Sequence, residues 1–250
     1  MQDSVIGSVT ALCFGVTGDA VVKATALSVA EIYSASVTCE RFSRDAFQRQ
    51  IAYANCIVVS KPKQPLDATF GARGVVDHPS VAIPALSKRT DIIVLDPSSS
   101  NEAEEVLDYC LDERRQLLLL PGRGSVASSF PEIIILWDRG MIQTTSLLPL
   151  APLMHQAEKI QILVEGNAAR SIHAVDAATR YLDQLRASRH DDTVEVVARL
   201  SGTVLKKAAA CADLVIVTRR ATRFSAWRPE LRIRKVLAYI DVPTLVTREI

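Results

Sequence analysis

The sequence predicts an α/β protein with two similar halves, each a parallel β-sheet with helices on both faces. Three observations predict this class. Apolar strand-like segments alternate with helical segments along the chain, which is typical of parallel sheets. The strand segments are continuous Val, Ile and Leu runs, as expected for strands buried on both sides. The order of segments also repeats: Leu12 and Ile134 are 122 residues apart, and so are Asp91 and Asp213.

The first half is expected to open with a strand at Ala11–Val16. A helix over 20–34 and a strand at Ser36–Phe42 follow. Further along, "DIIVLD" from Asp91 predicts a strand, "NEAEEVLDYCLDE" a helix and "QLLLLPG" a closing strand.

The second half repeats this plan. "EIIILWD" at Glu132–Asp138 and "KIQILVEG" from Lys159 predict strands, and an amphipathic helix follows over 173–188. "TVEVVARL" predicts a strand, and "SGTVLKKAAACA" a helix capped by Ser201. "DLVIV" and "VPTLVTREI" predict the last two strands. The Gly- and Ser-rich segment between the halves predicts a linker, giving domains 1–124 and 130–250.

Composition argues against several classes of protein. The net charge is +1 over 250 residues, so we expect neither a nucleic-acid partner nor a membrane partner. No apolar segment reaches the length of a membrane span, and the N-terminus has no basic region of a signal peptide. Five scattered cysteines without a C-x-x-C spacing indicate reduced, mostly buried thiols. We therefore expect a cytoplasmic protein.

Basic residues gather late in the chain. The segment Arg219–Lys235 contains seven Lys or Arg residues and a single acid, Glu230. Such a basic patch can hold phosphate, dock an acidic partner or form a solvated surface.

Several of these segments resemble those of tandem universal stress proteins, which carry two universal-stress-like domains in one chain. "IIILWDRG" opens the second half, and "ADLVIVTRR" and "VLAYIDVPTLVTRE" close it; "TDIIVLDP" and "QLLLLPG" match more weakly in the first half. The resemblance implies two tandem, doubly wound, five-stranded parallel sheets with strand order 3-2-1-4-5, Rossmann-like or adenine nucleotide alpha hydrolase-like. It also implies a stress-linked role and an intramolecular pseudo-dimer, and it is compatible with a homodimer.

Nucleotide-binding members of that family use an Asp at a strand exit near adenine and a G-x2-G-x9-G-S/T loop around the phosphates. Small residues in that loop expose backbone N–H groups to the anion. Here Asp138 matches the Asp, but Thr218 and Ala221 stand at the first two glycine positions. Near the third, the chain reads Glu230-Leu231-Arg232. The candidate cofactor-binding residues are Asp138, Gly140, Val164, Thr218, Arg219, Arg220, Ala221, Arg223 and Arg232.

The first half departs further from the family pattern. Asp96 and Ser99 occupy its first two glycine positions, and the acidic "NEAEEV" follows. The exit of the first strand carries no immediate Asp, since Asp19 lies three residues beyond Val16. Because carboxylates repel phosphate, we expect a degenerate domain that does not bind ATP.

Three functions remain open. The first is a universal stress protein-like binding or regulatory protein whose loops are degenerate in both halves and do not bind ATP in the usual way. The second binds ATP or another adenine nucleotide through Asp138, Arg219, Arg220 and Arg223, since Arg holds phosphate bidentately. The third is a scaffold that docks an acidic protein partner on Arg219–Lys235.

No catalytic or metal site is predicted. No general base stands beside the loop after "DLVIV", so we expect at most slow ATP hydrolysis. The four histidines do not combine with cysteines or carboxylates at metal-ligand spacing.

Overall fold

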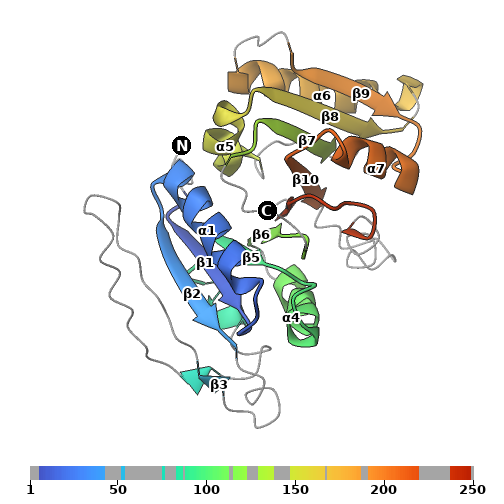
Figure 1. The fold of residues 1–250 in the computed structure, drawn as a ribbon. Coiled ribbons are helices and arrows are strands. Elements are labelled where there is room, and N and C mark those ends of the chain that lie inside the picture. Colours follow the sequence, from blue (N-terminus) through green and yellow to red (C-terminus); the bar gives the residue numbers. More distant parts are fainter. Residues whose placement is uncertain are drawn as a thin grey trace. The chain divides into compact units, whose positions relative to one another are not determined.

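The chain forms two compact units, residues 5–128 and residues 129–250, in a computed structural model (Figure 1). The structure describes residues 6–42, 52–53, 75–76, 83–86, 88–112, 115–122, 129–137, 147–166, 168–186, 191–219 and 237–248. Both units are built from parallel strands alternating with helices, so the predicted α/β class is confirmed.

The first unit contains parallel strands in the order β2-β1-β5-β6. These strands are β1 (Ser8–Cys13), β2 (Ser36–Arg41), β5 (Ile92–Leu95) and β6 (Gln116–Leu119). Helix α1 (Asp19–Tyr33) packs on β1, β2 and β5, and α4 (Asn101–Asp112) packs on β5. A separate antiparallel pair is formed by β3 (Ala52–Tyr53) and β4 (Val75–Val76). Among the described residues of this unit the parallel sheet has four strands, so the predicted five-stranded sheet is not confirmed here.

The first strand lies three residues earlier than predicted. β1 covers Ser8–Cys13, whereas the sequence pattern favoured Ala11–Val16. The strand cannot run on because Gly15 has a left-handed φ of +78°, a conformation that favours glycine. The apolar character of the segment extends through this turn, and for that reason hydrophobicity alone placed the strand too late.

The second unit contains parallel strands in the order β9-β8-β7-β10-β11, which is 3-2-1-4-5 along this half. The strands are β7 (Glu132–Trp137), β8 (Lys159–Glu165), β9 (Thr193–Val197), β10 (Leu214–Arg219) and β11 (Thr244–Arg248). The helical segments are η1 (Leu148–Leu150), α5 (Ala151–Gln156), α6 (Ala168–Arg186) and α7 (Gly202–Ala209). This half has the strand order that the resemblance implied.

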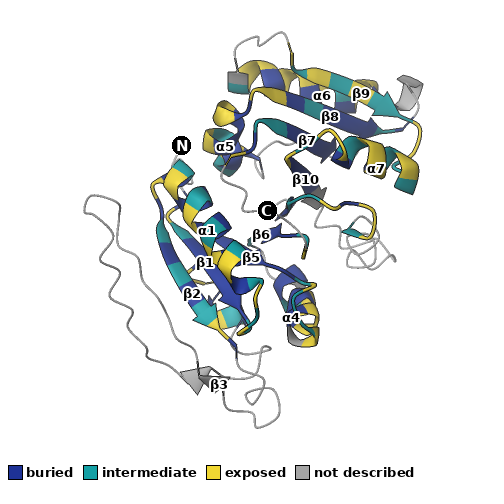
Figure 2. Ribbon diagram, in the orientation of Figure 1, coloured by how far each residue is buried: buried dark blue, intermediate teal, exposed yellow. Residues whose placement is uncertain are grey.

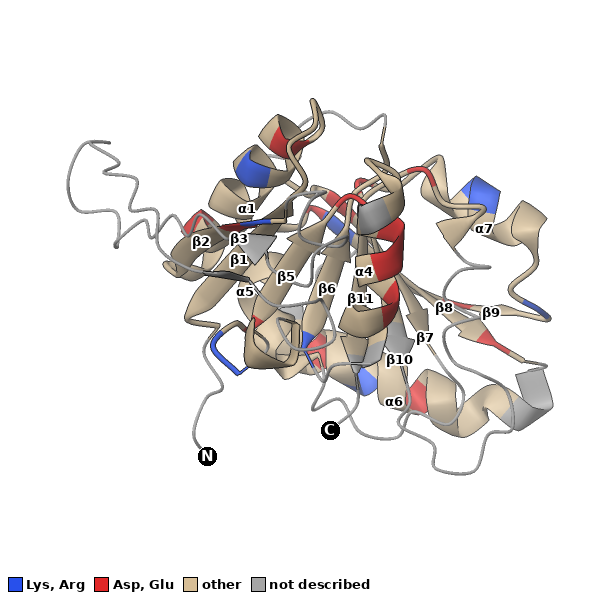
Figure 3. Cartoon of the chain, turned by 90° about the horizontal axis from the view of Figure 1, so that it is seen from below, with Lys and Arg blue, Asp and Glu red and all other residues tan. Residues whose placement is uncertain are grey.

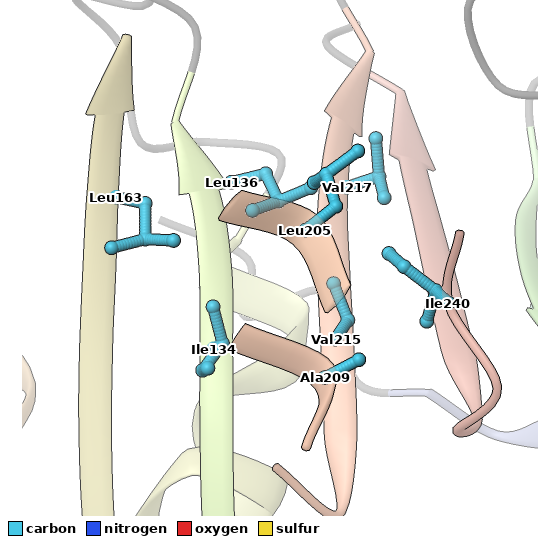
Figure 4. Packing of buried hydrophobic residues seen from close by; sticks show 8 residues of the cluster. All are labelled: Ile134, Leu136, Leu163, Leu205, Ala209, Val215, Val217 and Ile240. Atoms are coloured by element: carbon cyan, nitrogen blue, oxygen red, sulfur yellow. The ribbon is translucent and has the colours of Figure 1, made fainter. Parts of the chain in front are cut away.

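Helices cover both faces of the second sheet. Ile134 and Leu136 of β7 pack with Leu205 and Ala209 of α7 in one buried cluster (Figure 4). Successive side chains of a strand point to opposite faces, so Trp137 faces away from α7. Its ring lies 5.9 Å from that of Tyr181 on α6. The sheet is therefore doubly wound, with its inner strands largely buried, the edge strand β9 partly exposed and its helices exposed on their outer sides (Figure 2).

Helix ends follow local chemistry. Ser201 caps α7 as predicted, because its Oγ accepts a hydrogen bond from the backbone N–H of Val204 at 3.4 Å. Helix α6 begins at Ala168, five residues before the predicted start at His173. Its first turn, "AARS", has no apolar periodicity and was missed for that reason. Among the described helices, none is long and apolar enough to cross a membrane.

Candidate functional site

The predicted nucleotide crevice lies in the second unit, where the strand order reverses. β7 and β10 are parallel neighbours, with Leu136 beside Val217, so β7 ends at Trp137 next to the end of β10 at Arg219. Ligands of doubly wound sheets bind beyond the carboxyl ends of strands at such a point. The two segments that follow these strands, residues 138–146 and 220–236, lie outside the described residues.

Three of the nine predicted binding residues lie in the described part of the chain. Val164 is fully buried on β8 beside Trp137. Thr218 and Arg219 form the last two positions of β10, paired with Thr247 and Arg248 of β11. The other predicted binding residues lie outside the described residues: Asp138, Gly140, Arg220, Ala221, Arg223 and Arg232.

In the first unit the corresponding strand exit is occupied by the chain itself. The Asp19 carboxylate accepts backbone N–H groups from Phe14 at 2.9 Å, Gly15 at 2.7 Å and Val16 at 3.3 Å. Consecutive N–H groups of this kind form an anion-binding concavity, here called the anion nest. The carboxylate is buried, with 9% of the residue exposed. The anion nest therefore already holds an anion.

The loop after β5 is closed in the same way. Asp96 is buried, and its Oδ1 accepts hydrogen bonds from the backbone N–H of Ser98 at 2.9 Å and from its Oγ at 2.8 Å. The Oγ of Ser99 donates to the Asp96 carbonyl at 2.8 Å. In this loop the family pattern expects glycines with open N–H groups, but here side chains bind the backbone instead.

These two loops approach each other closely. A Cβ added to Gly18, at the start of α1, would lie 3.3 Å from Oδ2 of Asp96. A Cβ added to Gly122, after β6, would lie 3.5 Å from Oδ1 of the same carboxylate. The Asp96 carboxylate thus lies near both Gly18 and Gly122, and the Asp19 and Asp96 carboxylates both lie at the carboxyl end of this sheet.

Helix α4 adds negative charge to the first unit. Its exposed positions include Glu104, Glu105 and Asp108, and no Lys or Arg lies within its range Asn101–Asp112 (Figure 3). Coulomb repulsion from these carboxylates disfavours a phosphate nearby. Cations lie elsewhere in this unit. Lys23 on α1 lies near Cys39, and Arg41 at the end of β2 lies near the anion nest, since a Cβ at Gly15 would meet its Nη2 at 2.9 Å.

Metal ligation has no support in the described part of the chain. No group of three or more His, Cys, Asp or Glu side chains there could hold a metal ion.

The sequence singled out Asp19, Asp96 and Ser99 in the first half but missed Ser98, whose N–H and hydroxyl both bind Asp96. The spacing Asp-x-Ser is the usual pattern of such a turn and could have indicated it.

Comparison with known proteins identifies the fold. No family model and no curated protein matches the chain. A universal stress protein from Archaeoglobus fulgidus DSM 4304 superposes with a TM-score of 0.63 at 10% identity, covering 97% of this chain and 96% of that one. A protein provisionally assigned as a universal stress protein, from Pseudomonas aeruginosa UCBPP-PA14, gives 0.61 at 12% identity, covering 97% and 93%.

A third solved structure agrees. A functionally unknown protein from Pseudomonas aeruginosa PAO1 gives a TM-score of 0.60 at 12% identity, covering 97% of this chain and 92% of that one. Identities this low carry information about the fold and not about the ligand. With its parallel sheets and alternating helices, the chain has the fold of a universal stress protein.

Proposed function

We propose that this chain is a tandem universal-stress-like protein that acts by binding and regulation, not by catalysis. Its nucleotide-binding loops are degenerate in both halves, and it does not bind ATP in the usual way. Two features support the proposal. The order β2-β1-β5-β6 in the first unit matches β8-β7-β10-β11 in the second, and the solved structures with this fold cover 97% of the chain.

The strongest support for the proposal is the position of the Asp19 carboxylate in the anion nest. A phosphate could bind these N–H groups only by displacing Asp19 and its three hydrogen bonds. Hydrogen bonds to a charged group contribute about 1.5–3 kcal/mol each, so displacement opposes phosphate binding strongly. Asp96 would then lie close to the ligand and repel it. The first half therefore serves as a structural unit with a sealed crevice.

The test is a search for bound nucleotide. The full-length protein is purified without added nucleotide and denatured, and the released small molecules are identified by mass spectrometry. The native protein is then titrated with MgATP by calorimetry. We expect no released adenine nucleotide and no binding heat. Adenine nucleotide in either measurement would contradict degenerate loops in both halves.

A second candidate is an Arg-based phosphate site in the second unit. It is favoured by the position of Arg219, which ends β10 beside the end of β7. If nucleotide is found, the double substitution Arg219→Ala/Arg220→Ala should weaken binding at least tenfold. The matched control is Lys206→Ala/Lys207→Ala, which removes two exposed cations from α7 of the same unit. Equal loss in both variants would contradict a specific arginine site.

A third candidate is docking of an acidic partner on Arg219–Lys235, supported by the excess of cations in that segment. Poly-L-glutamate serves as the probe. Binding that falls in Arg219→Ala/Arg220→Ala but not in the lysine control would support it, while equal binding by all three proteins would not.

A further inference from the structure

Two cysteine sulfurs lie in contact inside the first unit. β1 and β2 are parallel neighbours, with Ala11 beside Cys39 and Cys13 beside Arg41. Cys13 and Cys39 are thus diagonal neighbours on one face of the sheet, because residues two apart on a strand share a face. Their Sγ atoms are 3.1 Å apart. The sequence predicted separate core thiols and gave no indication of this pair.

The two thiols have different surroundings. Cys13 is 1% exposed on an inner strand, whereas Cys39 is 5% exposed on β2, the outermost strand of this sheet among the described residues. Negative charge is therefore better placed on Cys39. We assign the hydrogen bond accordingly, with the Cys13 thiol as donor and the Cys39 sulfur as acceptor.

The hydrogen bond between the two thiols separates their pKa values. It lowers the pKa of the Cys39 thiol, and the Lys23 ammonium on α1 lowers it further, while burial and the carboxylates of Asp19 and Glu40 oppose this without reversing it. The same hydrogen bond raises the pKa of Cys13, and burial and the charges of Cys39 and Asp19 raise it further, against the effect of Lys23. Since the thiolate is the reactive form, Cys39 is the nucleophile of the pair and Cys13 its neutral partner.

We propose that Cys13 and Cys39 form a peroxide-reactive dithiol that closes to an intramolecular disulfide and is reopened by an external dithiol reductant. The proposal is independent of whether the protein binds nucleotide. It assigns an oxidative modification site to the first unit, next to the anion nest in which Asp19 lies.

The chemistry balances without a further reactant. The Cys39 thiolate attacks one oxygen of hydrogen peroxide, the O–O bond breaks, and hydroxide leaves, so that Cys39 becomes a sulfenic acid. This hydroxide takes up the proton that the Cys39 thiol lost on ionising and becomes the first water. The Cys13 sulfur then attacks the sulfenic sulfur, the S–O bond breaks and the S–S bond forms. The departing hydroxide takes the Cys13 proton and leaves as water. Two thiols and one peroxide thus give one disulfide and two waters.

Closing the bond requires the backbone to move as well as the side chains, because diagonal neighbours on a sheet lie about 7–8 Å apart and a disulfide spans Cα atoms up to about 7 Å apart. The sulfurs must approach by about 1 Å, from 3.1 Å to the disulfide length of about 2.0 Å. A diagonal bridge between strands is strained, and strained disulfides are the readily reduced ones. Cys13 directly precedes Phe14, whose N–H donates to Asp19, and the Cys13 carbonyl accepts from Phe42 at 2.8 Å. The disulfide would therefore form at the residue that directly precedes the anion nest.

The first experiment uses the wild-type protein. Full-length protein is treated with hydrogen peroxide and denatured, and its free thiols are alkylated and counted by mass spectrometry. The alkylated protein is then digested to identify peptides linked by a disulfide. We expect the count to fall from five to three, with a linked pair of peptides that contains Cys13 and Cys39, and to return to five with dithiothreitol. A count of five after treatment, or a disulfide between any other cysteines, would overturn the proposal. Cys110→Ser, which removes another buried thiol of this unit, should leave the linked pair unchanged.

The second experiment separates the two roles. Cys13→Ser should stop the reaction at the sulfenic acid of Cys39, which dimedone traps as an adduct. Cys39→Ser should give no adduct on Cys13. An adduct on Cys13 in the second variant, with none on Cys39 in the first, would overturn the assignment of the nucleophile. Circular dichroism of both variants checks that they fold.

Discussion

Thr10 and Ile134 occupy equivalent positions in the sheets of the two units, but Thr10 has a polar side chain and Ile134 an apolar one. Thr10 pairs with Ile93 across β1 and β5, and Ile134 pairs with Val215 across β7 and β10. Thr10 is fully buried, and its hydroxyl contacts those of Thr38 at 2.6 Å and Thr90 at 2.8 Å. Ile134, in contrast, belongs to the apolar cluster under α7.

The comparison shows that one strand order can be stabilised by two kinds of interior. A buried hydroxyl without a hydrogen-bond partner lowers the stability of the fold, so the three threonines depend on one another. The apolar cluster is stabilised instead by the close packing of its side chains, so it depends on their volume. It also corrects the repeat: the first strands of the two units are related by 124 residues, from Thr10 to Ile134, not by the 122 that the sequence indicated.

The largest effect is expected from Ile134→Ala. The side chain is 3% exposed, so its truncation leaves a cavity beside Leu205 and Val215. Such cavities cost about 2–5 kcal/mol of unfolding free energy. Urea unfolding monitored by tryptophan fluorescence, to which the buried Trp137 of the same unit contributes, measures this. A cost below that of Thr10→Ala would contradict the contrast between the two positions.

The threonine cluster should be non-additive. Thr10→Val removes the hydrogen-bond partner of both Thr38 and Thr90, and a buried hydroxyl left without a partner costs about 1–3 kcal/mol. Replacing all three threonines by valine removes every hydroxyl and should cost less than the single change. Urea unfolding followed by circular dichroism compares the variants. A triple variant that loses several times the stability of Thr10→Val would show that the hydroxyls do not act as a group.

At the amino-terminal ends of the strands, Asp91 and Asp213 should contribute differently to the free energy of unfolding. Oδ2 of Asp91 accepts from Gly7 N at 2.9 Å, Ser8 N at 3.0 Å and Ser8 Oγ at 2.9 Å. Oδ2 of Asp213, its equivalent, accepts from Glu132 N at 2.8 Å. At about 0.5–1.5 kcal/mol per hydrogen bond, Asp91→Ala should cost clearly more than Asp213→Ala. Equal losses in urea unfolding would mean that the additional hydrogen bonds of Asp91 contribute nothing.

The smallest effect is expected at the cap of α7. Ser201→Ala removes a hydrogen bond of 3.4 Å, near the upper limit of length, so the cost should lie at the low end, about 0.5 kcal/mol. Ser201→Gly should cost only a few tenths. Thermal unfolding of both variants measures this, and a loss from Ser201→Ala as large as that from Ile134→Ala would show that the cap is underestimated.

Much of the fold could be predicted from the sequence. The continuous apolar runs placed β5 and β7 within one residue of their ends, because buried parallel strands need apolar residues throughout. The alternating pattern of β2 was also placed within one residue of its ends. β1 was misplaced because the turn at Gly15 carries the apolar residues Phe14 and Val16. The threonine cluster could not be predicted, since three hydroxyls far apart in the sequence meet only in the folded sheet.

The candidate site was predicted only in part. The departures from the glycine loop in the first half, at Asp96 and Ser99, pointed to the loop that the structure shows closed on itself. That Asp19 fills the anion nest could not be read from spacing, because it depends on the left-handed conformation of Gly15. In the second half, the prediction at Asp138 and Arg220 stays a prediction.

The closed anion nest is tested most directly by nuclear magnetic resonance of the full-length, 15N-labelled protein during a titration with MgATP. The amide resonances to follow are those of Phe14, Gly15 and Val16, which donate to Asp19. If Asp19 keeps the nest occupied, these three resonances stay unmoved at millimolar nucleotide. Saturable shifts of all three would show that phosphate displaces the carboxylate, and would contradict a sealed first half.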